Sequence, residues 1–222
     1  MNKVKVLNTL SYYIHRVYKS GEVFLQTLNL DKTMKEYLYQ NIIAFLVIIF
    51  VTFINGQAYI GGNIIWLPIG AVSLCYLLFG FRIVIAVFIA ISISAHLGDY
   101  THFPGHNLIH VVGTLAPLLA IASMKFFKLS YFFDGGKIVF QHLLFLGILT
   151  ALYNTLMKFF AYSYLALASG GSVSIDALQF IKNYLIGDIL GCLFILFFAA
   201  LVIVPGIRYF APKLVPSEYK SK

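Results

Sequence analysis

Charged residues are scarce in this chain. Of its 222 residues, 11% are Asp, Glu, Lys or Arg and 60% are hydrophobic, whereas soluble domains carry about 25% charged residues. So few charges cannot cover the surface of a soluble domain that has this much apolar material to bury. The composition therefore excludes a soluble globular protein and predicts an all-α, polytopic integral membrane helix bundle that forms one domain in the lipid bilayer.

Acidic residues are the scarcer charged type, with 8 Asp and Glu against 16 Lys and Arg, which gives a net charge of +8. A basic balance of this size also occurs in nucleic-acid-binding proteins. Here, however, the basic residues lie between apolar runs, as the positive-inside rule of membrane topology requires. We therefore expect no nucleic-acid partner.

Cysteine and catalytic motifs are also nearly absent. Cys75 and Cys192 both lie inside apolar runs, which excludes a disulfide framework or a zinc ribbon and predicts buried free thiols. There is no HExxH motif, nucleophile elbow, P-loop or dinucleotide fingerprint in a supporting context. The first apolar run begins near Asn41 without a small-residue cleavage site, so no cleavable signal peptide is expected. We predict a protein that is not an enzyme.

What the chain does contain is long apolar runs. A membrane-spanning helix needs about 20 mostly apolar residues, and by this criterion we expect about six spans. They cover residues 38–53, 64–79, 82–97, 107–124, 139–167 and 177–204. The second and third runs are joined only by Gly80, Phe81 and Arg82. We expect the resulting hairpin, residues 63–99, to be the element around which the other helices pack.

The connections between these runs alternate between basic and non-basic. The connection 125–137 carries three lysines and the tail from Arg208 is basic, whereas residues 55–62 and 169–176 contain no Lys or Arg. Six spans with both termini in the cytoplasm satisfy this pattern. We therefore expect a multi-pass protein of the bacterial cytoplasmic (inner) membrane, with a transmembrane domain at 36–206 and a short basic cytoplasmic tail at 207–222.

The segment before the first span, residues 1–35, mixes apolar and basic residues. Val6, Leu10, Tyr13 and Val17 recur at helical spacing, which predicts an amphipathic amino-terminal helix on the inner membrane surface. The alternative is a helix that packs on the protein's own loops.

Histidines cluster near the predicted outer face. Four of the six lie within fifteen residues, together with one carboxylate: His96, Asp99, His102, His106 and His110. Imidazole and carboxylate groups can bind Zn²⁺ or another divalent ion, and histidine can also ligate haem. The alternatives are a polar ligand site, or an outer loop that uses histidines as interfacial polar groups. The sequence leaves all three open and names no cofactor.

Ionisable residues inside the predicted spans form a second candidate site. Lys158 lies in the fifth run, and Lys182 and Asp188 lie in the sixth. Such groups are costly in a bilayer, so they normally face the bundle interior and pair. Counting from the connection between the two runs places Lys158 and Asp188 at about the same depth. We therefore predict a Lys158–Asp188 ion pair, extended by Asn154; the alternative is that Lys158 reaches the membrane surface alone.

Two stretches rich in Gly and Pro complete the candidates. Trp66, Pro68 and Gly70 open the second run, where Pro and Gly free backbone groups that need another partner. In the sixth run, Gly187 and Gly191 flank Asp188 and would let a neighbouring helix approach closely. We predict a polar intramembrane cavity that is lined by Trp66, Pro68, Asp99, Asn154, Lys158 and Asp188.

These two stretches resemble motifs of the membrane-associated sensor family, first type (the MASE group). The family's W-P-x-x-G opening and L-F-G-x-R ending correspond to residues 66–70 and 78–82, and its late G-D-x-x-G corresponds to residues 187–191. The chain departs from the pattern by the additional Leu67 and by lacking the output domain that members usually carry, such as a histidine kinase or diguanylate cyclase. The resemblance implies a stand-alone sensor of signal transduction that binds a cytoplasmic partner.

A second resemblance is to the substrate-binding subunits of vitamin importers of the energy-coupling-factor type, which are also basic six-helix proteins of this size. It implies a small-molecule site near the outer face. The G-D-x-x-G element favours the sensor. Our leading hypothesis is a non-enzymatic membrane sensor or docking module that binds a small ligand or helix and a cytoplasmic signalling or scaffold protein; the alternative is the importer subunit. Homo-oligomerisation stays open.

Overall fold

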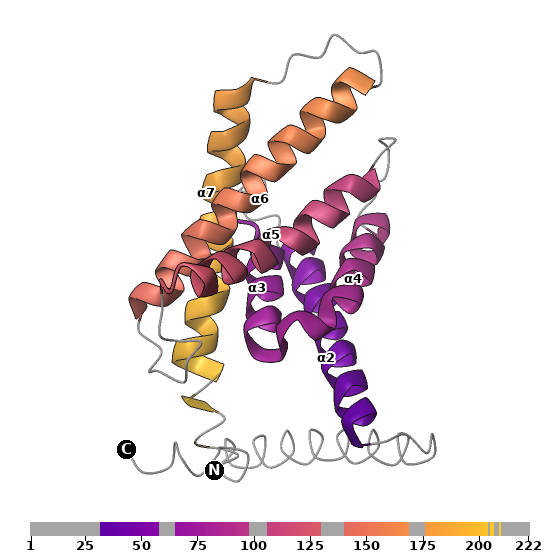
Figure 1. The fold of residues 1–222 in the computed structure, drawn as a ribbon, viewed down its shortest axis with the longest axis vertical. Helices are drawn as coiled ribbons and strands as arrows, with labels where there is room; N and C mark the ends of the chain where they lie inside the picture. The colour runs from indigo at the N-terminus through magenta and orange to yellow at the C-terminus, as the bar shows by residue number, and fades with distance from the viewer. Residues whose placement is uncertain are drawn as a thin grey trace. The chain divides into compact units, whose positions relative to one another are not determined.

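The structure, a computed structural model, describes residues 32–57, 65–97, 106–129, 140–168, 176–203, 205–206 and 209. In these ranges every regular element is a helix (Figure 1). Contacts divide the chain into a large unit, Gln40–Val202, and a second unit made of Met1–Tyr39 with Ile203–Lys222. The fold described below is that of the large unit. The predicted amphipathic helix at 1–35 lies almost entirely outside the described residues.

The helices follow the apolar runs closely. Their bounds are α2 (Lys32–Gln57), α3 (Leu67–Phe79), the 3₁₀ turn η1 (Gly80–Ile83), α4 (Val84–Leu97), α5 (His106–Phe126), α6 (Phe140–Ala168) and α7 (Ala177–Phe198), which continues into the π-helical turn η3 (Ala199–Ile203). α2 crosses the boundary between the two units. Five stretches of the described residues are long and apolar enough to cross a membrane. The predicted all-α membrane bundle is confirmed.

The difference from six full spans lies in the α3–α4 hairpin. α3 has 13 residues and α4 has 14, so each is only about 20 Å long, shorter than a hydrocarbon core of about 30 Å. Because α3, η1 and α4 follow each other without a break, Leu67–His96 is one of the five apolar helical stretches, where the sequence predicted two. α3 ends at Gly80, where φ is +70° and the backbone N–H donates to the Tyr76 carbonyl. Only glycine adopts this conformation without strain, so the helix stops and the chain turns.

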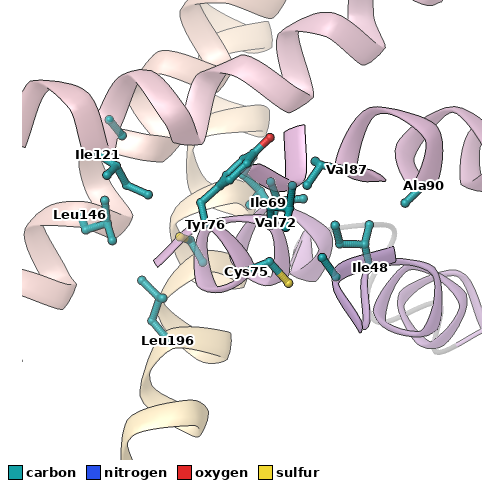
Figure 2. Packing of buried hydrophobic residues seen from close by; sticks show 14 of the residues in the cluster. Ile48, Ile69, Val72, Cys75, Tyr76, Val87, Ala90, Ile121, Leu146 and Leu196 are labelled. Carbon is teal, nitrogen blue, oxygen red and sulfur yellow. The ribbon is translucent and has the colours of Figure 1, made fainter. Parts of the chain in front are cut away.

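α3 lies at the centre of the hydrophobic core. Figure 2 shows its side chains at positions 72, 75 and 76 between residues of the other helices. Those residues are Ile48 of α2, Val87 and Ala90 of α4, Ile121 of α5, Leu146 of α6 and Leu196 of α7. Around this core α3 packs against α7, α4 against α5, and α6 against both α5 and α7. The bundle is therefore organised around the first half of the predicted hairpin.

The outward-facing surfaces are apolar. Leu46, Phe50 and Phe53 of α2 are each more than half exposed. In water such a surface would drive association. In a bilayer it is the surface that contacts lipid, in agreement with the membrane-spanning composition.

Candidate functional site

α6 and α7 face each other through polar and aromatic side chains at four-residue spacing. On α6 these are Thr150, Asn154, Lys158 and Tyr162, and on α7 they are Phe180, Tyr184, Asp188 and Cys192. Residues four apart lie on the same face of a helix, one turn above each other. Because the two helices pack side by side, the two stripes meet along most of the contact.

Asp188 is the ionisable group at the centre of this contact. Its side chain is 1% exposed, and Asn154 and Thr155 on α6 are completely buried. The Asn154 amide Nδ2 donates a hydrogen bond of 2.6 Å to Asp188 Oδ2. The Thr155 hydroxyl lies beside the same carboxyl without reaching hydrogen-bond geometry. The predicted neighbourhood of Asn154 and Asp188 is thus present, and the carboxyl is held by a neutral amide.

The predicted Lys158–Asp188 pair is present as an electrostatic interaction and, among the residues described, not as a direct salt bridge. Lys158 Nζ instead lies over the ring of Tyr184, 5.3 Å from its centroid, in a cation–π contact. The register explains the difference. Asn154 is opposite Asp188, and Lys158 is one turn nearer the end of α6, so it is opposite Tyr184.

Aromatic rings fill the part of the α6–α7 contact that lies between these charges and the ends of the helices at Ala168 and Ala177. Phe180 stacks on Tyr184 with centroids 4.3 Å apart. Phe159 and Tyr162 of α6 contact Phe180 at 5.7 and 5.8 Å. Sequence reasoning did not single out this cluster. The signal was available, because positions 180 and 184 continue the four-residue spacing of Asp188.

The amino-terminal end of α3 packs on α7 beside the contact with α6. The Trp66 backbone N–H donates a 3.0 Å hydrogen bond to the Gly187 carbonyl. A Cβ atom on Gly191 would overlap the Trp66 carbonyl, and one on Gly70 would lie 2.7 Å from the Gly191 oxygen. Such distances leave no room for a side chain. The two short motifs that sequence analysis singled out are therefore in direct contact, through backbone.

Asn55 of α2 is a residue that sequence reasoning missed. Its side chain is 6% exposed, and its Oδ1 accepts a 2.8 Å hydrogen bond from the Leu67 backbone N–H. The first N–H groups of a helix have no partner within that helix, and Pro68 has none to offer. The N–H groups of Leu67 and Trp66, just before Pro68, are thus bonded to Asn55 of α2 and Gly187 of α7. An Asn after a long apolar run was the only signal.

Two further residues link α3 to the polar stripe of α7. Cys192 lies one turn beyond Asp188, and its Sγ donates to Ser73 Oγ at 3.7 Å. Both cysteines are free and buried, as predicted. Of the predicted cavity residues, Pro68 is buried in α3, and Trp66 and Lys158 are half-buried. Lys182, the other lysine predicted inside the sixth run, lies exposed on α7.

The outer histidines are only partly described. His96 is exposed at the end of α4, where its Nδ1 lies 2.8 Å from the Ser92 carbonyl. His110 is 3% exposed within α5. Asp99, His102 and the side chain of His106 lie outside the described residues. Within the described ranges no three His, Cys, Asp or Glu side chains gather to hold a metal ion, so the predicted metal or haem site stays a prediction.

Comparison with known proteins gives no relative. The chain matches no protein-family model, no curated protein and no solved structure. The likeness to membrane sensors therefore rests on the short motifs alone, and the likeness to importer subunits rests on size, charge and helix number.

Proposed function

We propose that this protein is a non-enzymatic membrane sensor or docking module of signal transduction. Its ligand, a small molecule or a helix, would bind at the polar contact between α6 and α7. The observation that carries the proposal is Asp188, a carboxyl group that is 1% exposed in a bundle of membrane-spanning helices. Ionisable groups inside a bilayer are rare and usually functional because burying them is costly.

The position of Asp188 supports sensing more than simple binding. Its neighbour in the chain, Gly187, holds the amino-terminal end of α3 through the Trp66 N–H, and α3 forms the centre of the core. A rotation or shift of α7 at position 188 would therefore move the acceptor to which α3 is attached. Packed helices with alternative arrangements are the usual means by which one site influences another.

The remaining parts of the proposal follow the charge pattern of the sequence. The basic segments at 125–137 and after Arg208, together with both chain ends, would lie on the cytoplasmic side of a bacterial inner membrane. There they would contact a signalling or scaffold protein. The runner-up is the substrate-binding subunit of a vitamin-type importer. Both functions use an intramembrane polar site, so they are distinguished by the small molecule and the partner protein that purify with the chain.

The test is to purify the full chain in nanodiscs from cells that express it and to identify bound small molecules and proteins by mass spectrometry. We expect a signalling or scaffold protein with the wild type, and loss of any bound small molecule from Asp188→Asn. Lys182→Met, which changes an exposed charge on the same helix, is the matched control and should behave like the wild type.

Other outcomes contradict the proposal. A vitamin-type molecule that accompanies an ATP-hydrolysing partner would establish the importer reading. Bound metal or a Soret absorption band would favour the outer histidines as the functional site. A wild-type protein that retains neither a signalling partner nor a ligand would remove the support for a sensor.

A further inference from the structure

Several polar atoms around Asp188 are buried without a protein partner. Asn154 Oδ1 and the hydroxyls of Thr150 and Thr155 have no hydrogen-bond partner in the part of the chain that the structure describes, and all three residues are completely buried. Buried polar groups in native proteins are nearly always hydrogen-bonded, to protein or to ordered water. Three such atoms on adjacent turns of one helix indicate that something other than the protein satisfies them.

The charged groups of Lys158 and Asp188 also indicate a bound species at this place. Lys158 has three N–H donors, yet within the described ranges its ammonium interacts with the Tyr184 ring and electrostatically with Asp188, without a hydrogen bond to either. Asp188 accepts a hydrogen bond from Asn154. An ammonium and a carboxylate that interact over more than hydrogen-bond distance in a low-dielectric interior are commonly joined by water.

The mixture of groups identifies the bound species. A metal cation would suit the carboxylate, amide and hydroxyl oxygens, but Lys158 already places a positive charge at the site. An anion would suit Lys158, but Asp188 opposes it. Water both donates and accepts, so it serves the Lys158 ammonium, the Asp188 carboxylate and the hydroxyl of Thr155 together.

We propose that ordered water molecules bind inside the membrane domain between Lys158 and Asp188, where Thr155 and Asn154 complete their hydrogen bonds. The aromatic cluster of Phe159, Tyr162, Phe180 and Tyr184 covers this site toward the far ends of α6 and α7. The water converts two separated charges into a bridged ion pair, which is how both remain within the bilayer. This site does not depend on the sensor proposal.

Water-edited solid-state NMR of the full chain in lipid bilayers tests the proposal. The experiment measures how fast magnetisation passes from water to individual side chains. The matched internal control is Thr114 of α5, which is also buried, at 2% exposure against 0% for Thr155, but donates its hydroxyl to the His110 carbonyl at 2.8 Å. We expect the Thr155 signal to build up several-fold faster than that of Thr114. Equal, slow build-up at both threonines would overturn the proposal.

A variant measures whether the charged pair holds the water. In Lys158→Met/Asp188→Leu both charges are replaced by apolar groups, and we expect the Thr155 build-up to fall to the level of Thr114. Fast build-up that persists in the folded double variant would contradict the assignment of the water to the charged pair. The comparison of Thr155 with Thr114 in the wild type stands whether or not this variant folds.

Discussion

α7 contacts its two neighbours, α3 and α6, in different ways. Toward α3 it presents Gly187 and Gly191, and there backbone lies against backbone, with a hydrogen bond from the Trp66 N–H to the Gly187 carbonyl. Toward α6 it presents Tyr184 and Asp188, and the contact is made by side-chain amide, carboxyl, ammonium and rings. The α3 side has no space for an added methyl group. The contact with α6 buries polar atoms that have no hydrogen-bond partner among the described residues.

This difference separates two kinds of specificity. The α3 side depends on shape, so it should tolerate no added volume, because an added carbon must displace backbone. The α6 side depends on charge and hydrogen bonding, so it should tolerate changes of shape better than changes of charge. The following predictions test that distinction, from the largest expected effect to the smallest.

Gly191→Ala should have the largest effect. The added Cβ would overlap the Trp66 carbonyl, and because backbone on both sides prevents relaxation we expect destabilisation by about 3 kcal/mol or failure to fold. Unfolding in mixed detergent micelles measures it. The matched control is Gly113→Ala in α5, where a Cβ would make an ordinary 3.6 Å contact with Ile91. Equal effects of the two substitutions would show that the α3–α7 contact is not limited by shape.

Asp188→Asn should come next. It leaves the Lys158 ammonium in the bundle without its counter-charge, and a lone lysine at the centre of a span costs about 2.5–3.5 kcal/mol on insertion scales. We therefore expect Asp188→Asn to destabilise the fold more than the double variant Lys158→Met/Asp188→Asn. Unfolding free energies of both single variants and the double variant give the coupling. Equal destabilisation in the single and double variants would mean that the two charges do not stabilise each other.

Asn55→Ala should have an intermediate effect. It removes the acceptor of the Leu67 N–H, and loss of a helix cap typically costs about 0.5–2 kcal/mol. We expect lower stability together with a shift in the fluorescence of Trp66, the single tryptophan of the chain. Asn41→Ala, whose amide makes a longer 3.5 Å bond to the Arg82 carbonyl, serves as the control. A Trp66 spectrum that is the same in both variants would argue against this cap.

Tyr184→Phe and Tyr184→Leu should have the smallest effects and differ from each other. Phe keeps the ring that faces Lys158 and stacks on Phe180, whereas Leu removes it. A cation–π contact contributes about 0.5–2 kcal/mol, depending on how far the cation is desolvated. We expect Tyr184→Phe to be close to the wild type and Tyr184→Leu to be less stable in the same unfolding assay. If the two variants are equally stable, the ring contributes nothing to holding Lys158.

Much of the fold could be predicted because the composition and the lengths of the apolar runs determine where membrane-spanning helices form. Apolar runs placed α5, α6 and α7 within a few residues of their observed ends, since a bilayer requires long apolar segments. Gly187 and Gly191 were correctly taken as sites of close approach. What could not be predicted was the partner, because a glycine pair indicates that a helix comes near but not which helix does. The contact with Trp66 required the tertiary structure.

The relative positions of Asn154, Lys158 and Asp188 were predicted to within one helical turn. Depth counting placed Lys158 and Asp188 together, but residue counts do not determine helix register to better than the 5.4 Å of one turn. Asn154 therefore took the position opposite Asp188. Asn55 was missed for another reason: a cap supplied by a distant helix leaves no pattern in the local sequence.

The central claim is that α7 connects the buried carboxyl at position 188 to the amino-terminal end of α3. The most direct test is the fluorescence spectrum of Trp66 in folded Asp188→Asn in lipid nanodiscs, beside wild type and the surface variant Lys182→Met. A changed emission maximum in Asp188→Asn alone is the predicted result. An emission maximum identical in all three proteins would contradict the connection.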